Sequence, residues 1–321
     1  MSSWYEHLDG HDDNRQRAIV GTLKSLCLLL ALALGALPPA PAAVVVSSKL
    51  SSESAMLGQM IRLLLNAHDI PTVDRTKIGA TPVVRKALLT GEIDLYVEYT
   101  GNAGFFFNDA ANPAWKDLAR GYALGARLDY EANHIVWLTP ARASNAWALA
   151  VRQDVAARNQ LVTLSDFSRW VRGGGAVVLA CSAEFANAGA LRSLERTYDF
   201  TLRSEQLIVL AGGETAATIA AAAAGTSGTN TAMVYGTDGG IAAAKLRMLE
   251  DDRHDQPIYA PVPIIREAVL KQYPQIAPLV KPLMESFSRE SLQQLNARVQ
   301  IDGEDEEAVA AEYLRAQGFV R

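Results

Sequence analysis

Four aromatic residues stand next to small or turn-forming residues at the ends of segments that read as strands. Tyr99 precedes Thr-Gly-Asn, Trp147 follows Ser-Asn, Tyr235 precedes Gly-Thr-Asp-Gly, and Tyr259 lies in the stretch Pro-Ile-Tyr-Ala-Pro. The face of an aromatic ring attracts a cation, and several rings together can enclose a quaternary ammonium ion. The four residues therefore predict an aromatic cage if they converge in space. The alternative is that each ring caps a hydrophobic core or fills a cleft.

The sequence contains no motif for nucleotide binding or for metalloprotease chemistry. It has neither a G-x-x-x-x-G-K-[ST] loop nor a G-x-G-x-x-G motif after a strand, and it has no H-E-x-x-H. The three histidines after residue 42, which are His68, His134 and His254, are scattered along the chain. The acidic stretches 250–255 and 302–307 read as solvated turns. We therefore expect no metal and no cofactor.

The segments that must position the aromatic residues alternate between strands and helices. Short β-branched and apolar runs predict strands, and apolar residues at helical spacing predict helices. The expected strands are residues 43–48, 93–99, 134–138, 146–151, 177–180, 207–210, 232–235, 248–250 and 258–262. The expected helices are residues 57–65, 81–89, 114–132, 164–171, 191–198, 216–224 and 276–321.

This alternation predicts an α/β architecture, in which helices cover parallel sheets and ligands bind beyond the carboxyl ends of the strands. A chain of 321 residues holds about two domains. No long linker of low complexity divides the sequence. We therefore favour two lobes, joined by crossing connections and separated by a cleft, over one large sheet.

The composition narrows the class of protein. The chain is 49% hydrophobic and 20% charged, which is typical of a globular protein. Its net charge is −5, whereas a nucleic-acid binder usually presents a basic surface. We therefore expect no nucleic-acid partner.

The N-terminus has the three parts of a secretory signal peptide. Basic residues precede the uncharged apolar run at 25–37, and small residues follow it, ending in Ala-Pro-Ala at 40–42. We expect cleavage after residue 42 and export to the periplasm, with an uncleaved N-terminal anchor as the alternative. Cleavage would remove Cys27 and leave Cys181 as the single cysteine, so no internal disulfide could form. We expect Cys181 to be buried and inert.

Several stretches of the chain match a known pattern. They are VSSK at 46–49 followed by Glu53, GEIDLYVEYTG at 91–101, NAWALAV at 145–151, EF at 184–185, YDF at 198–200, YGTDG at 235–239, LEDD at 249–252 and LN at 295–296. On these stretches, residues 45–321 resemble the solute-binding proteins of ABC importers for osmoprotectants such as glycine betaine and choline. The stretches 91–101 and 235–239 are specific when taken together.

This resemblance implies a fold and a division of the chain. The fold is a two-lobe α/β periplasmic binding-protein fold, type II-like, which closes like a hinge on a ligand in the cleft between its lobes. On this sequence we expect lobe 1 at residues 43–148 and 253–321, and lobe 2 at residues 149–252.

The resemblance also implies the cage. The family's cage positions fall on Tyr99, Trp147, Tyr235 and Tyr259. Trp147 stands where relatives typically have Tyr. Because a Trp face is the best partner for a cation, the cage should tolerate this change.

The polar positions of the family site are matched only in part. Lys49 stands at a position that helps to hold a ligand carboxylate, and Asn102 stands at a Thr-like polar position. Asn145 replaces an Asp of close relatives. Ala188 stands about where relatives have an Arg that clamps the carboxylate, so carboxylate binding should be weaker here. Arg142 could substitute for that Arg if its side chain turned into the cleft.

We therefore predict a periplasmic solute-binding protein without enzymatic activity. It captures a small quaternary ammonium solute, binds glycine betaine weakly, and delivers its solute to an ABC permease with its ATPase; we expect a monomer. One rival is a binding protein for another polar solute, such as an amino acid, if the aromatic residues fail to converge. A second rival is a secreted enzyme on the same fold with Asp238 and Glu98 as acid–base residues, although no nucleophile–base pair is evident.

Overall fold

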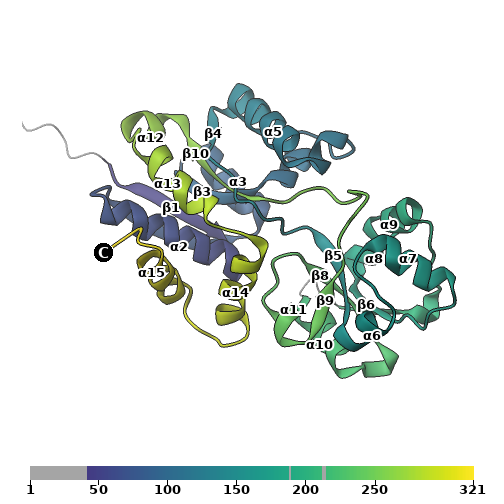
Figure 1. Ribbon diagram of the computed structural model, residues 1–321. Helices are drawn as coiled ribbons and strands as arrows, with labels where there is room; N and C mark the ends of the chain where they lie inside the picture. The colour runs from purple at the N-terminus through teal and green to yellow at the C-terminus, as the bar shows by residue number, and fades with distance from the viewer. Residues whose placement is uncertain (1–41, 188, 212–214) are drawn as a thin grey trace, which may run out of the picture. The chain divides into compact units, whose positions relative to one another are not determined.

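Ten strands form two five-stranded sheets in the part of the chain that the structure describes, which is residues 42–187, 189–211 and 215–321 (Figure 1). The structure is a computed structural model. Both sheets belong to one unit, Ala43–Arg321. The predicted signal peptide, except for residue 42, lies outside the described residues.

The first sheet has the strand order β2-β1-β3-β10-β4. Its strands are β1 (Val44–Lys49), β2 (Thr72–Gly79), β3 (Leu95–Tyr99), β4 (Ile135–Trp137) and β10 (Pro261–Arg266). The helices that connect and follow these strands are α2 (Ser52–Ala67), α3 (Thr81–Thr90), α4 (Ala103–Phe106), α5 (Leu118–Asn133), α12 (Glu267–Gln272), α13 (Ile276–Glu285), α14 (Arg289–Gln300) and α15 (Glu306–Ala316).

Alternate residues of these strands supply two apolar cores, one on each face of the sheet. In β3, Leu95 and Val97 pack into the core shared with α2, α13 and α15, while Tyr96 packs into the core shared with α3. In β10, Ile265 joins the first core and Ile264 the second. Because both faces are covered, the central strands are apolar nearly throughout.

The second sheet has the strand order β7-β6-β8-β5-β9. Its strands are β5 (Trp147–Arg152), β6 (Leu179–Ser182), β7 (Leu207–Leu210), β8 (Thr231–Tyr235) and β9 (Leu246–Met248). Its helices are α6 (Gln153–Arg158), α7 (Leu164–Arg172), α8 (Ala183–Asn187), α9 (Ala190–Tyr198), α10 (Thr215–Ala224) and α11 (Gly240–Ala243). Cys181 lies in the core of this sheet, fully buried, as expected.

Both sheets are mixed, which corrects the expectation of parallel sheets. β10 runs antiparallel to β3 and β4, and β5 runs antiparallel to β8 and β9. Both strands follow a connection from the other sheet, so each begins where the carboxyl ends of its neighbours lie. The first residues of β5 and β10, Trp147 and Pro261, are therefore the register partners of Tyr235 and Tyr99, the last residues of β8 and β3.

The two connections between the sheets lie side by side. They are residues 138–146 and 249–260, and the backbone N–H of Asn145 donates to the carbonyl of Tyr259 at 2.9 Å. The N–H of Tyr259 donates in turn to the hydroxyl of Ser144 at 3.0 Å. The predicted lobe boundary at 148–149 falls inside β5, and the one at 252–253 falls in the second connection. The lobe boundaries themselves stay a prediction.

The structure differs from the expected elements at β2, at the C-terminal helix, at β10 and at β9, which occupies Leu246–Met248 rather than 248–250. β2 was not foreseen, because it is an edge strand in which half of the residues are exposed and none is buried, so it carries little hydrophobic pattern. The expected C-terminal helix is three helices, with Ser288 capping α14 and Asp305 capping α15. β10 occupies residues 261–266 rather than 258–262, because the residues before it belong to the connection.

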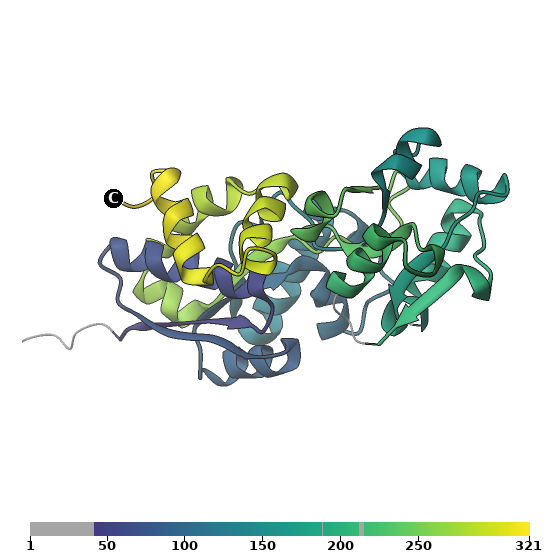
Figure 2. The same ribbon diagram turned by 90° about the horizontal axis from the view of Figure 1, so that it is seen from below.

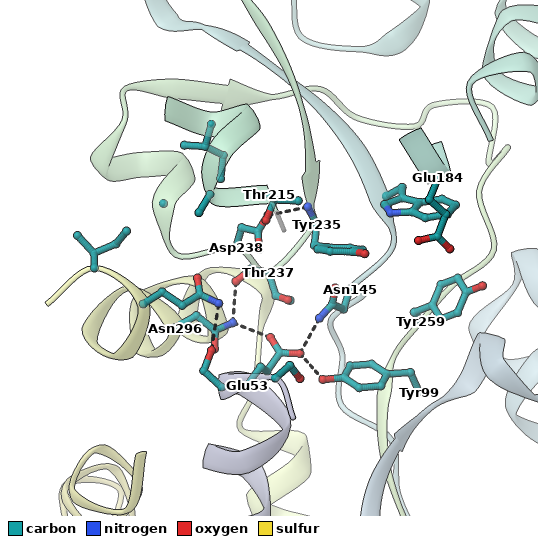
Figure 3. Close-up of a pocket in the computed structure, with 18 of the residues that line it drawn as sticks. Glu53, Tyr99, Asn145, Glu184, Thr215, Tyr235, Thr237, Asp238, Tyr259 and Asn296 are labelled. Carbon is teal, nitrogen blue, oxygen red and sulfur yellow. Dashed lines mark hydrogen bonds between the residues drawn. The ribbon is translucent and has the colours of Figure 1, made fainter. Parts of the chain in front are cut away.

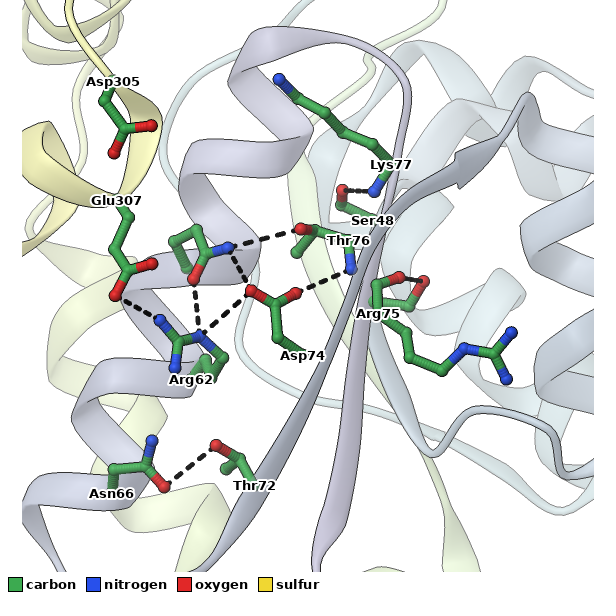
Figure 4. A network of polar contacts seen from close by, with 12 residues as sticks. Ser48, Arg62, Asn66, Thr72, Asp74, Arg75, Thr76, Lys77, Asp305 and Glu307 are labelled. Carbon is green, nitrogen blue, oxygen red and sulfur yellow. Dashed lines mark hydrogen bonds and ion pairs between the residues drawn. The ribbon is translucent and has the colours of Figure 1, made fainter.

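The C-terminal helix α15 packs against α2, and both ribbon views show the yellow helices beside the purple one (Figure 1, Figure 2). Val309 and Leu314 join the apolar core of α2. Around that core, Arg62 of α2 pairs with Glu307 at 2.6 Å and lies 3.6 Å from Asp74 of β2 (Figure 4). Apolar and polar contacts together therefore hold the C-terminal helix α15 against α2.

Candidate functional site

Most of the predicted site residues line one cavity of about 960 Å³ (Figure 3). Six of the seven predicted binding residues line it: Tyr99, Asn102, Asn145, Trp147, Tyr235 and Tyr259. The seventh, Lys49, is not in the lining. Residues that belong to both sheets and to both connections form the walls, so the cavity lies between the two halves of the fold.

The mixed sheets bring the aromatic residues to one place. Trp147 and Tyr235 are direct register partners in the antiparallel pair of β5 and β8. Tyr99 is the register partner of Pro261, and Tyr259 precedes Pro261 by two residues. Two of the aromatic residues therefore come from strand ends and two from strand beginnings or just before.

Gly101 is needed where it stands because the ring of Tyr259 approaches its backbone. A Cβ atom at position 101 would lie 2.8 Å from Cε1 of Tyr259, closer than two such carbons can pack. Position 239 also requires glycine, because α14 packs closely against it. A Cβ atom there would lie 2.2 Å from the backbone nitrogen of Ala297. The glycines of the YTG and YGTDG stretches therefore let the walls of the cavity close together.

Glu53, the second residue of α2, accepts hydrogen bonds from three other residues around the cavity. It is 3% exposed. Its Oε1 accepts hydrogen bonds from the hydroxyl of Tyr99 at 2.7 Å and from Nδ2 of Asn145 at 2.9 Å. Its Oε2 accepts from Nδ2 of Asn296 at 2.6 Å, and the same nitrogen donates to the carbonyl of Thr237 at 2.7 Å. One carboxylate thus ties α2 to β3, to the first connection and, through Asn296, to the turn after β8.

Lys49 has a protein carboxylate as its partner. Its ammonium group pairs with Glu98, which is fully buried, and lies 4.9 Å from the centroid of the Tyr99 ring. Glu98 also accepts from the hydroxyl of Tyr96 at 2.8 Å and from Nδ2 of Asn102 at 2.7 Å. The charge of Lys49 is therefore neutralised outside the cavity lining, and this arrangement gives no support to the expectation that it holds a ligand carboxylate.

Burial and negative charge raise the pKa values of two cage tyrosines, Tyr99 and Tyr259. Burial, followed by the charges of Tyr235, Glu184 and Glu98, raises the pKa of Tyr259 to about 12. Burial, followed by the charge and hydrogen bond of Glu53, raises the pKa of Tyr99 well above its ordinary value of 10.0. Both rings are therefore neutral at physiological pH.

Trp147 forms one wall of the cavity. Its ring meets Phe185 edge to face, with centroids 5.7 Å apart and an interplanar angle of 86°. Its indole N–H is buried without a hydrogen-bond partner among the described residues. The wall is thus held by apolar packing rather than by a polar anchor.

Several polar residues of the lining are not among the site residues that the sequence predicted. Glu53, Glu184 and Asn296 line the cavity, and all three belong to the stretches that carried the resemblance. A polar residue inside a matching stretch was the signal that could have identified them. Arg142 is exposed and lines a different hollow, so it does not replace the missing Arg. Ala188 lies outside the described residues.

Within residues 42–187, 189–211 and 215–321, no group of three or more His, Cys, Asp or Glu side chains is arranged to hold a metal ion. Over the same ranges, no helix has both the length and the hydrophobicity to cross a lipid bilayer.

Comparisons with known proteins agree with this geometry. Residues 42–316 match the family model of the substrate-binding domain of the ABC-type glycine betaine transport system. YehZ of Escherichia coli strain K12, a glycine betaine-binding protein, is 49% identical over 298 residues, which cover 92% of this chain and 97% of YehZ. A glycine-betaine-binding protein of Pseudomonas aeruginosa is 28% identical over 300 residues, covering 91% of this chain and 94% of that protein.

A solved structure of apo YehZ from Escherichia coli shares the fold. Its TM-score is 0.80 at 49% identity, and the match covers 87% of this chain and 100% of that one. The predicted two-lobe α/β fold is therefore confirmed. Because the family model matches residues 42–316 and 49% of the 298 residues aligned with YehZ are identical, the chain belongs to the substrate-binding domain family of ABC-type glycine betaine transport systems.

Proposed function

We propose that this protein captures a small quaternary ammonium solute, such as glycine betaine or choline, in the cavity between its two halves. The observation that carries the proposal is that Tyr99, Trp147, Tyr235 and Tyr259 line one cavity in a member of this family. The names of the Escherichia coli and Pseudomonas aeruginosa relatives, both glycine betaine-binding proteins, support the same class of ligand.

The binding mechanism is physical. A methylated ammonium ion holds its water weakly, and the faces of electron-rich rings replace that water. Closure of the two halves about the paired connections, residues 138–146 and 249–260, would remove the remaining water and strengthen the attraction. The closed form would then present a surface for an ABC permease that works with an ATPase.

We further propose that the mature protein acts as a monomer in the periplasm and begins at or near Ala43. The basic residues, the apolar run at 25–37 and the Ala-Pro-Ala ending at residue 42 support this processing. Mass spectrometry of the periplasmic fraction should find the processed N-terminus. An intact chain in the membrane fraction would support the alternative of an uncleaved anchor.

We propose a transport role rather than an enzymatic one. The rival assignment uses Glu98 and Asp238 as an acid–base pair, but Glu98 is fully buried against Lys49 and does not line the cavity. Incubation of the purified protein with candidate solutes should give no product. Turnover that is lost in Asp238→Asn would favour the enzyme.

Calorimetric titration with matched pairs of solutes tests the ligand class. Glycine betaine and glycine differ only in the three methyl groups of the ammonium, and so do choline and ethanolamine. A methylated member should bind while its unmethylated partner does not, because only the methylated ion is both large and weakly hydrated. Binding of an amino acid without binding of any methylated solute would instead support the rival of an amino-acid-binding protein.

A further inference from the structure

The lining of the cavity has an unbalanced charge. Among the described lining residues, the charged side chains are Glu53, Glu184 and Asp238, and neither lysine nor arginine is present. The nearest basic group that the resemblance suggested, Lys49, is already paired with Glu98. The field in the cavity is therefore negative, and the raised pKa of Tyr259, to which the charge of Glu184 contributes, is consistent with it.

The donors of the cavity already hold a carboxylate. The hydroxyl of Tyr99 and the side-chain nitrogens of Asn145 and Asn296 all point at Glu53 (Figure 3). Tyr99 has one proton to give, and Asn296 uses its nitrogen for both Glu53 and the carbonyl of Thr237. Three convergent neutral donors are what the carboxylate of a zwitterionic ligand would need, and Glu53 occupies them.

The buried atoms without a hydrogen-bond partner supply no charge that would hold a ligand carboxylate. Among the described residues, the buried side-chain atoms without a hydrogen-bond partner are Oδ1 of Asn296 and Nε1 of Trp147. The first is an acceptor and the second a neutral donor, and both are shielded from solvent, so neither is open to a ligand in the cavity. Neither atom could balance the charge of a carboxylate as an arginine would.

We propose that the cavity selects a quaternary ammonium solute with net positive charge and an uncharged tail over a zwitterion with the same ammonium head. In this arrangement Glu53 acts as an internal carboxylate that takes the place of the ligand's own. Glu184, which is exposed on α8 and lines the cavity from the second half, adds a countercharge for the cation. This inference rests on the proposed function, because it assumes that the aromatic cage holds the ammonium group.

The test compares choline with glycine betaine, which share a trimethylammonium head and differ in the charge of the tail. In the wild-type protein, calorimetry should give a dissociation constant for choline at least about tenfold below that for glycine betaine, the size expected for one unfavourable charge contact in a partly desolvated site. Glu53→Gln should move the ratio of the two constants toward glycine betaine by about tenfold or more. Glu205→Gln is the matched control, because it removes the same charge from an exposed residue outside the cavity that pairs with Arg203, and it should leave the ratio unchanged.

Glu184→Gln keeps the test decisive if Glu53→Gln does not fold, because Glu184 is exposed and its side chain supports no described hydrogen bond network. It should weaken choline more than glycine betaine. Tighter binding of glycine betaine than of choline by the wild-type protein, or a ratio that neither variant shifts, would overturn the inference and leave the proposed function standing. Failure of both solutes to bind would overturn the proposed function and the inference with it.

Discussion

Trp147 and Tyr235 face each other as register partners across the antiparallel pair of β5 and β8. One is the first residue of its strand and the other the last, so the pair marks the edge of the second sheet that borders the cavity. Directly opposed residues in such a pair have Cα atoms about 4.5–5.5 Å apart. The backbone ladder, rather than the side chains, therefore sets the position of both rings.

Removal of the Trp147 ring should weaken binding without moving its neighbour. We expect Trp147→Ala to lower the affinity for a quaternary ammonium solute by about 1–2 kcal/mol or more, because one cation–π contact is lost from a desolvated cage. Trp147→Phe, which keeps an aromatic face, should lose less. Calorimetry on variants with native circular dichroism measures the effect, and an unchanged affinity in Trp147→Ala would remove this residue from the site.

A methyl group at position 101 should disturb Tyr259. Gly101→Ala would place its Cβ 2.8 Å from the Tyr259 ring, so the ring must move and binding should weaken. In a Tyr259→Ala background the same substitution should cost little more affinity, because its clash partner is absent. Titration of the four proteins of this double-mutant cycle tests the coupling. Additive losses would show that Gly101 acts by another route.

The buried pair of Arg85 and Asp129 should stabilise the first half of the fold. Asp129 accepts from Arg85 at 2.8 and 2.5 Å and from the indole N–H of Trp137 at 2.8 Å. Asp129→Ala would leave a buried guanidinium unpaired, and we expect it to lower the free energy of unfolding by about 3–5 kcal/mol. Glu131→Ala removes the exposed partner of Arg127 on the same helix and should cost about 0.5 kcal/mol or less. Urea denaturation of both variants measures the contrast, and equal losses would contradict it.

The raised pKa of Tyr259 predicts that the folded protein loses stability at alkaline pH. The pKa of Tyr259 is raised to about 12 in the folded protein, whereas an unfolded tyrosine titrates near pH 10. The folded state therefore holds this proton more tightly, so its contribution to stability is complete below about pH 10 and is lost as the pH rises through about 12. The free energy of unfolding, measured by denaturant titration between pH 9 and 12, should fall more steeply in the wild type than in Tyr259→Phe. Parallel curves for the two proteins would be evidence against this contribution.

The residue at position 188 should control the affinity for carboxylate-bearing betaines. This prediction rests on the family resemblance alone. A charge-assisted hydrogen bond is worth about 1.5–3 kcal/mol, so Ala188→Arg should tighten glycine betaine roughly ten- to hundredfold. Binding of choline should be unchanged or weaker. If the natural protein already binds glycine betaine below micromolar concentrations, another donor must take the place of the missing arginine.

The local sequence by itself determined which segments become the inner strands and which aromatic residues stand at their ends. Leu95 and Val97 belong to the apolar run 93–99 that predicted a strand, and Gly91 ends α3 with φ 78°, a left-handed conformation that glycine adopts readily. These features depend on residues close together in the chain, so the pattern of residue types was enough to predict them. The edge strand β2 carried too weak a pattern, because none of its residues is buried.

Only the tertiary structure decided the direction of β5 and β10 and the partners of the charged groups. The strand direction depends on where the chain re-enters a sheet after crossing from the other one, which no local pattern records. Lys49 pairs with Glu98, which lies 49 residues further along the chain. Glu53 accepts a hydrogen bond from Asn296, which lies 243 residues further along. Whether such a group faces a ligand or another part of the protein depends on contacts between segments that are far apart in the chain. For this reason the sequence predicted the residues of the aromatic cage, but only the fold showed that a protein carboxylate lies among the donors beside it.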